Sequence, residues 1–392
     1  MEEVLVLRGG QVLVEPGLLR TADVVLRGGR VDEVLPGGST GRTSTAGGTV
    51  RDVDVAGLTV VPGYLDLQVN GAHGVDLTRS PEDLPAVADA LTRHGVTGFL
   101  PTLVSHPSGT VPRAVRALRL PLPPGAARPL GWHVEGPFLA PARRGAHRLE
   151  HLRAPAADEA ASWSPDGGVR MVTLAPELPE ALDLVRVLAG RGVVVSLGHT
   201  EATADQVRAA VDAGARAVTH LFNAMPGLGH RTPGPVGAAL ADDRVVCGLI
   251  PDGLHVDPLV LGLAWRLLGP RRWLTVTDTT AALGCPPGPS RLGDAEIVVD
   301  ATSVRLPDGT LAGSVLALDE AVVRLVRLVG VDPLDAVATV TAVPARLLGL
   351  PARDAVRPGL RDLTLLDEGL RCAGTVVDGV LRLREPERRL RG

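Results

Sequence analysis

The sequence predicts an α/β protein, a (β/α)8 TIM-type barrel joined to a small β-sandwich domain that both chain termini form. Three observations point to this fold class. The middle of the 392-residue chain alternates short apolar runs with helical stretches, both ends contain short β-type runs separated by turn residues, and 45% of all residues are hydrophobic. A chain of this length and composition can bury a large core.

We predict that the small β-sandwich domain comprises residues 1–57 and 355–392. Its β-type runs are Val4–Leu7, Gln11–Val14, Asp23–Leu26, Val31–Leu35, Val50–Val55, Asp362–Leu366, Gly374–Val377 and Val380–Leu383. Asp378 and Gly379 are typical of a hairpin turn between the last two runs. A Gly/Ser/Thr-rich stretch, residues 37–48, is expected to be a loop.

Residues 58–354 are predicted to form the barrel. Eight short, mostly apolar runs suit parallel strands that are buried on both faces. These runs are Leu58–Gln68, Gly98–Leu103, Leu130–Glu135, Arg170–Leu174, Val193–Leu197, Ala217–Leu221, Val245–Ile250 and Trp273–Thr277. The helical stretches are Glu82–His94, Pro179–Arg191, Ala204–Ala213, Pro258–Leu268, Val315–Val329 and Pro333–Leu348.

Composition excludes several classes of function. The formal net charge is −4 and there is no basic tract, so we expect no nucleic-acid partner. All 40 basic residues are arginine, which excludes lysine Schiff-base chemistry, Walker phosphate loops and a metal pair bridged by a carbamylated lysine.

Cysteine usage and hydropathy indicate the compartment. Three widely spaced cysteines favour reduced thiols over a disulfide framework. No apolar run approaches the ~20 residues of a membrane span, and the first residues do not resemble a signal peptide. We therefore expect a cytoplasmic protein without a membrane partner.

Polar side chains end six of the eight predicted strands, where a barrel of this type places its chemistry. Glu135, His199 and His220 make a candidate metal site that leaves a coordination position open for water. Asp278, at the same rim, is suited to accept and return a proton. A single strand-end histidine is more often bonded to a backbone carbonyl, but the four residues together favour a metal centre.

Several strings of residues carry a resemblance to a known family. They are Gly131-Trp-His-Val-Glu-Gly-Pro-Phe138, Ser196-Leu-Gly-His-Thr200, Thr219-His-Leu-Phe-Asn-Ala-Met-Pro226, Asp252-Gly-Leu-His-Val-Asp257 and Val276-Thr-Asp278. With Val61-Pro-Gly-Tyr-Leu-Asp66 and Arg357-Pro-Gly359, the chain resembles the N-acetylglucosamine-6-phosphate deacetylase family of the amidohydrolase superfamily almost end to end.

The resemblance implies roles for individual residues. The family's metal ligands match Glu135, His199 and His220, and its general acid/base matches Asp278. His147 would act beside them by polarising the acyl oxygen. The substrate contacts that the resemblance implies are Ala146, His147, Asn223, Ala224, Arg231, His255 and Leu316. In the family the arginine that matches Arg231 binds the substrate phosphate and can come from a neighbouring subunit, which implies a homodimer.

The chain departs from many amidohydrolases at the first barrel strand. Gln68 and Asn70 occupy the positions of a metal-binding His-Xaa-His pair, and amides are poor ligands for zinc. We therefore expect one divalent metal per chain, with Gln68 and Asn70 in supporting contacts around it. Zinc is the foremost candidate, and iron, manganese and cobalt accept the same ligands.

The expected function is removal of the N-acetyl group from N-acetyl-D-glucosamine 6-phosphate, a step of amino-sugar catabolism. The same chemistry on N-acetylgalactosamine 6-phosphate remains open, because residues 313–318 are less polar than the family's usual string. A non-catalytic sugar-phosphate-binding protein would not need the complete set of four rim residues. A deaminase would be expected to have a first-strand His-Xaa-His pair.

Overall fold

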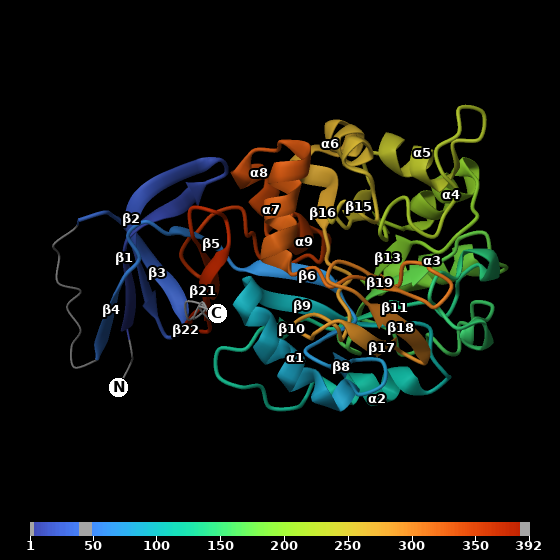
Figure 1. The fold of residues 1–392 in the computed structure, drawn as a ribbon, viewed down its shortest axis with the longest axis horizontal. Coiled ribbons are helices and arrows are strands. Elements are labelled where there is room, and N and C mark those ends of the chain that lie inside the picture. Colours follow the sequence, from blue (N-terminus) through green and yellow to red (C-terminus); the bar gives the residue numbers. More distant parts are fainter. Residues whose placement is uncertain (1–3, 39–48, 385–392) are drawn as a thin grey trace.

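The computed structural model describes residues 4–38 and 49–384, so most of the predicted 37–48 loop lies outside the described residues. Figure 1 shows two parts side by side, a β domain on the left and a barrel with its helices on the right. The strands of the β domain come from both ends of the chain, since blue and red segments lie next to each other there.

Each of the eight predicted runs contributes one strand to the barrel. They are β6 (Tyr64–Val69), β9 (Val96–Leu103), β11 (Trp132–Glu135), β12 (Val169–Leu174), β13 (Val194–Leu197), β14 (Ala217–Val218), β15 (Val246–Leu249) and β16 (Trp273–Thr275). They pair in parallel and in chain order, and the short β10 (Arg128–Pro129) pairs with β9. A parallel bridge between Val69 and Thr279 brings the two end strands together.

One predicted strand, Leu58–Gln68, is wrong as a single element. The structure divides it into β5 (Thr59–Pro62) and β6, with Gly63 between them. A Cβ at Gly63 would lie 2.1 Å from the Thr97 Oγ1, so only glycine fits where the chain turns from one sheet into the other. β5 pairs with a C-terminal strand, and β6 enters the barrel.

Helices surround the barrel. The α-helices are α1 (Leu84–Leu91), α2 (Thr110–Ala117), α3 (Ala181–Gly190), α4 (Ala204–Ala213), α5 (Gly234–Ala241), α6 (Pro258–Arg272), α7 (Leu318–Val329), α8 (Pro333–Ala338) and α9 (Ala342–Leu347). The 3-10 turns are η1 (Pro81–Asp83), η2 (Thr92–His94), η3 (Pro141–Arg143) and η4 (Leu149–His151). Their buried faces and the strands share one large hydrophobic core that includes Trp132, Trp273 and Phe99.

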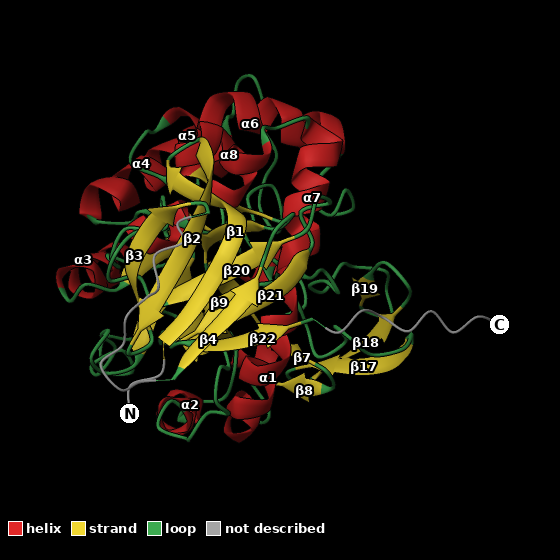
Figure 2. Cartoon of the chain, turned by 90° about the vertical axis from the view of Figure 1, so that its left-hand side faces the viewer, coloured by secondary structure: helices red, strands yellow, loops and turns green. Residues whose placement is uncertain are grey.

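The terminal β domain is built on one mixed sheet, seen face-on in Figure 2. Its order is β22-β21-β20-β5-β1-β2-β3, and β4 also pairs with β1. Besides β5, its strands are β1 (Val4–Glu15), β2 (Leu18–Arg27), β3 (Arg30–Pro36), β4 (Val50–Asp54), β20 (Asp362–Leu366), β21 (Cys372–Val377) and β22 (Val380–Leu383). Because β20 pairs with β5, both chain ends share one core. The exact division at residues 57/58 and 354/355 remains a prediction.

Two small antiparallel units lie outside the main sheets. β7 (Gly71–Ala72) pairs with β8 (Val75–Asp76), and β17 (Gly288–Leu292) forms a three-stranded sheet with β18 (Ala295–Val299) and β19 (Val304–Arg305). None of the helices in the described part of the chain combines the length and the apolar character that a bilayer span needs.

Candidate metal centre and active site

Four polar residues follow four different barrel strands at one rim. Glu135 ends β11, His199 follows β13, His220 follows β14, and Asp278 follows β16. Parallel strands in a barrel place their carboxyl ends at the same face, which is why residues so distant in sequence meet. All four side chains are buried.

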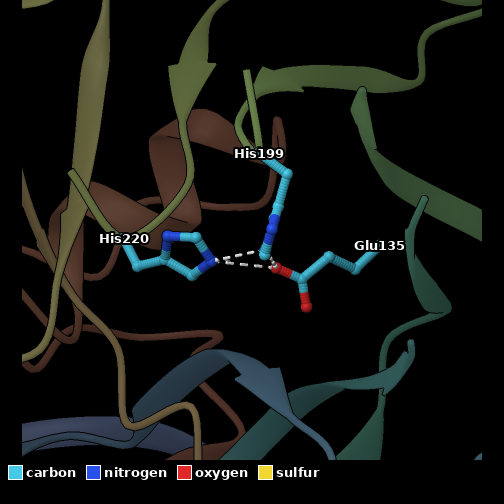
Figure 3. Close-up of side chains that lie close together, drawn as sticks. All are labelled: Glu135, His199 and His220. Atoms are coloured by element: carbon cyan, nitrogen blue, oxygen red, sulfur yellow. Dashed lines mark hydrogen bonds and ion pairs between the residues drawn. The ribbon is translucent and has the colours of Figure 1, made fainter. Parts of the chain in front are cut away.

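Glu135, His199 and His220 point toward a common centre (Figure 3). The Nε2 of His220 lies 3.1 Å from Glu135 Oε1 and 3.1 Å from the Nε2 of His199, whose distance to Glu135 Oε1 is 3.3 Å. Ligand bonds of about 2.0 Å at tetrahedral angles would give separations of about 3.3 Å. The three atoms are therefore spaced as ligands of one small cation.

The hydrogen bond on the other side of His199 supports this interpretation. Its Nδ1 donates to the carbonyl oxygen of Arg143 at 2.8 Å, because a carbonyl can only accept. In the neutral imidazole the Nε2 of His199 therefore carries a lone pair, and it faces a Glu135 carboxylate oxygen, another electron-pair donor. Two such atoms at 3.3 Å need positive charge between them, so the donor set fits a metal ion.

The pKa values of the two carboxylates at the rim are shifted in opposite directions. Burial alone would raise the pKa of Glu135, but its contacts with the imidazoles of His199 and His220 hold it well below its ordinary value. Burial, and then repulsion from Glu135, raise the pKa of Asp278 to about 6. Glu135 is thus suited to bind a cation permanently, and Asp278 to exchange a proton near neutral pH.

Gln68 and Asn70 contact both carboxylates. The Gln68 amide donates to Glu135 Oε1 at 3.2 Å and to Asp278 Oδ1 at 3.1 Å, and the Asn70 amide donates to the same Asp278 oxygen at 2.7 Å. These amides stand at the sequence positions where a His-Xaa-His pair would help to hold a second metal. They leave the other oxygen of Asp278, Oδ2, free of these bonds.

Backbone strain is concentrated at this rim. His199, His220 and Asp278 have φ values of 49°, 29° and 51°, and Ala224 has 52°. Non-glycine residues rarely adopt positive φ, and such strain gathers at functional sites because the surrounding fold must hold it.

A cavity of about 230 Å³ opens above the cluster. Its lining includes most of the residues predicted to contact substrate. Those residues are Ala146, His147, Asn223, Ala224 and His255, together with Asn70, the three candidate ligands and Asp278. Val104, Leu292 and residues 310–313 also line it; of these, the sequence offered a signal only for Gly313, because the others follow β9 or belong to the β17–β19 insertion and the segment after it.

Two imidazoles on the cavity wall are anchored in opposite ways. His255 Nδ1 bonds the Asp252 carboxylate at 2.6 Å. His147 Nδ1 lies 3.0 Å from the backbone nitrogen of Ser105 and 2.8 Å from its hydroxyl. Burial lowers the pKa of His147 to about 3, so His147 is neutral at physiological pH.

Two predicted substrate contacts do not line this cavity. Leu316 is buried in the barrel core. Arg231 is exposed and bonds its neighbour His230 at 2.6 Å. Among the described residues, no arginine lines the cavity, so one chain supplies no strong cation there for a phosphate.

Comparison with known proteins gives the class of protein that this fold and site define. The model of the amidohydrolase family matches residues 59–359, and the chain belongs to that family. Within it, the human N-acetylglucosamine-6-phosphate deacetylase is 36% identical over 96% of this chain and 93% of its own length. The N-acetylgalactosamine-6-phosphate deacetylase of Escherichia coli O157:H7 is also 36% identical, over 96% of this chain and 98% of its own length.

A solved structure covers nearly the whole molecule. It is a variant of the N-acetyl-D-glucosamine-6-phosphate deacetylase from Mycobacterium smegmatis in complex with N-acetyl-D-glucosamine-6-phosphate. Its identity to this chain is 34%, its TM-score is 0.85, and the match covers 98% of this chain and 100% of that one. The predicted family and the predicted fold class are confirmed.

Proposed function

We propose that this protein hydrolyses the acetamide of N-acetyl-D-glucosamine 6-phosphate to D-glucosamine 6-phosphate and acetate, a step in amino-sugar catabolism. The observation that carries this proposal is the convergence of Glu135, His199 and His220 beside Asp278 at the floor of one cavity. Relatives with this activity match almost the whole chain, which supports the same chemistry here.

Glu135, His199 and His220 would hold one divalent ion per chain, and we propose zinc. When bound, such an ion lowers the pKa of a water molecule toward about 7 and polarises the acyl oxygen. Gln68 and Asn70 direct their amide nitrogens at Asp278 and Glu135, and amides are poor ligands for zinc, which supports one ion rather than two.

Asp278 is proposed to act as the general base and then the general acid. Its carboxylate takes a proton from the attacking water while a bond forms between the water oxygen and the acetyl carbon. It then gives this proton to the amine nitrogen as the C–N bond breaks, so the leaving group departs as a neutral amine. A pKa of about 6 suits both transfers.

His147 is proposed to stabilise the negative charge that develops on the acyl oxygen. Its ring lies 4.4 Å from the ring of His199, centre to centre, so it borders the reacting position. A fixed donor of this kind contributes substantially to acyl-transfer rates.

The substrate phosphate would be bound between two copies of the chain. We propose that Asn223, Ala224 and His255 contact the sugar phosphate from one chain, with Ala146 shaping the sugar pocket. Arg231 of the neighbouring chain would supply the planar donor fork that suits a phosphate. This arrangement requires a homodimer, which agrees with the exposure of Arg231 and with its absence from the lining of its own cavity.

A second candidate substrate is N-acetylgalactosamine 6-phosphate. The E. coli relative named for that sugar is as similar to this chain as the human one, at 36% identity. The two sugars differ only in the configuration of one hydroxyl, and the chemistry at the metal would be the same.

We place the enzyme in the cytoplasm. Cys247, Cys285 and Cys372 are free thiols, which fits a reducing compartment.

The proposed function is tested by measuring acetate release from N-acetylglucosamine 6-phosphate by the purified protein. We expect turnover that a chelator abolishes and added zinc restores, with far slower reaction of unphosphorylated N-acetylglucosamine. N-acetylgalactosamine 6-phosphate is assayed in parallel to decide between the two epimers. Absence of acetate release from both phosphorylated sugars by the metal-loaded protein would refute the proposal.

A further inference from the structure

The contacts of His147 fix which of its ring nitrogens carries the proton. The backbone nitrogen of Ser105 lies 3.0 Å from His147 Nδ1, and a backbone N–H can only donate. The Nδ1 of His147 is therefore an acceptor. In a neutral imidazole the other nitrogen, Nε2, then carries the hydrogen.

The Nε2 of His147 is free to use that hydrogen in the cavity. His147 lines the cavity, and within the described part of the chain no hydrogen bond to Nε2 is found. His255 is held the other way round, because its Nδ1 donates to Asp252. The two cavity imidazoles therefore differ in what they can offer a ligand.

The Val104–Ser105 peptide group, whose N–H contacts His147, makes a second hydrogen bond through its carbonyl oxygen. The carbonyl oxygen of Val104, in the same peptide plane as the Ser105 N–H, accepts a hydrogen bond from His106 Nδ1 at 2.9 Å. The carbonyl and the N–H of a trans peptide point in opposite directions. A buried His106 on one side therefore orients the Ser105 N–H toward His147 on the other.

Gly136 provides the space for the contact between Ser105 and His147. Gly136, next to the candidate ligand Glu135, has φ +82°, and a Cβ built there would lie 2.4 Å from the Ser105 hydroxyl. The same Ser105 hydroxyl is 2.8 Å from His147 Nδ1. Glycine at this position thus leaves room for the serine against the imidazole.

From these contacts we propose that the Val104–Ser105 peptide, oriented by His106, locks His147 as the Nε2–H tautomer, a pure hydrogen-bond donor to the acyl oxygen of the substrate. In this arrangement His147 cannot remove a proton through Nε2, so Asp278 alone transfers protons. Ser105 and His106 are positioning residues, since they act through His147. The identity of the bound oxygen rests on the proposed function, whereas the tautomer does not.

The tautomer is read directly by 15N NMR of the zinc-loaded protein with labelled histidine. The signals of His147 are assigned by their disappearance in His147→Gln. We expect a protonated Nε2 and an unprotonated Nδ1. A protonated Nδ1 in the unaltered protein would overturn the proposal whether or not the protein releases acetate, so this result is independent of the proposed function.

A matched pair of variants tests the donor in the reaction. In His147→Gln the amide nitrogen can reach the former position of Nε2, whereas in His147→Asn it reaches only that of Nδ1. We expect kcat within about 10-fold of the unaltered enzyme for Gln and a loss of about 10²-fold or more for Asn. Equal kcat values in two variants that fold and retain zinc would contradict the assignment.

The role of His106 is tested in the same way. His106→Asn keeps a donor at the position of Nδ1, and His106→Leu removes it. We expect Leu to lower kcat several-fold and to disturb the NMR signals of His147, while Asn restores both. An unchanged His147 spectrum in His106→Leu would show that His106 has no positioning role.

Discussion

At the scale of single residues, the surroundings of each carboxylate at the barrel rim determine its role. Glu135 and Asp278 are both buried carboxylates, but imidazole partners lower the pKa of Glu135, whereas burial and then the charge of Glu135 raise the pKa of Asp278. Gln68 and Asn70 orient Asp278 through one oxygen, and its other oxygen remains available for the proton. Chemistry here follows from which groups surround each carboxylate.

Asp278→Asn tests the proton-transfer role. Asparagine keeps the shape of the side chain but cannot accept and return a proton, so we expect kcat to fall about 10²- to 10⁴-fold. Metal content, measured on the same preparation, should stay at one ion per chain, because Asp278 is not one of the three ligands. Asp294→Asn, an exposed aspartate, serves as the control. Near-normal turnover by Asp278→Asn would remove Asp278 from the mechanism.

The sequence predicted the three candidate metal ligands better than the residues that position the side chains around them. Glu135, His199 and His220 were recognisable because each ends a predicted strand, and parallel strands bring their ends together. Ser105 and His106 were not, because their part depends on the direction of one peptide plane. Thr310 to Ala312 reach the cavity from the segment after β19, whose placement no local pattern indicates.

At the scale of elements, predictions succeeded where hydrophobic pattern and turn chemistry agree. Each of the eight apolar runs contributes a barrel strand, and α4 has the predicted bounds, Ala204–Ala213, with a capping box of Thr203 and Gln206 at its start. α5 was missed because Gly234–Ala241 is almost wholly apolar and rich in glycine and alanine, so it lacks a polar face that would reveal a helical period. The division at Gly63 depends on a close contact with Thr97, which only the fold creates.

The start of α4 offers a stability prediction. Thr203 Oγ1 accepts a hydrogen bond from the backbone N–H of Gln206, and the side-chain Oε1 of Gln206 accepts one from the backbone N–H of Thr203. Thr203→Ala removes one half of this capping box, and we expect the free energy of unfolding to fall by about 1 kcal/mol. Urea denaturation measures it. Arg208→Ala, which breaks an exposed pair with Asp205, should change stability by less than about 0.5 kcal/mol. A larger effect for Arg208 than for Thr203 would contradict this ranking.

At the scale of the whole molecule, a buried carboxylate helps to join the terminal sheet to the barrel. Asp362 on β20 is fully buried and pairs with Arg128 beside β9 and with Arg353, at 2.6 Å from the latter. Removing one partner of a buried pair leaves the other charge without compensation. The small β domain and the barrel are thus joined by an ionic contact, in addition to the direct chain connection from β5 to β6.

Asp362→Ala is expected to destabilise the protein by about 3–5 kcal/mol, because Arg353 would remain buried without its carboxylate. Thermal and urea unfolding provide the measurement. Asp183→Ala, which breaks an exposed pair with Arg186, is the control and should be nearly neutral. A nearly neutral Asp362→Ala would show that this contact contributes little.

The proposed dimer predicts complementation between two inactive variants. Arg231→Ala and Asp278→Asn should each have little activity when pure. In a mixed dimer, the Arg231→Ala chain keeps Asp278 and receives Arg231 from its partner, so one site is intact. We expect co-expression to restore activity well above either variant alone. Failure to restore it in dimers shown to be mixed would place the phosphate site within one chain.

The central claim is that one ion, held by Glu135, His199 and His220, makes this cavity a hydrolase site. Its most direct test is a titration of the metal-free protein with zinc while acetate release from N-acetylglucosamine 6-phosphate is recorded. The rate should rise linearly and reach its plateau at one zinc ion per chain. A plateau at two ions per chain, or a rate that does not depend on added metal, would contradict the claim.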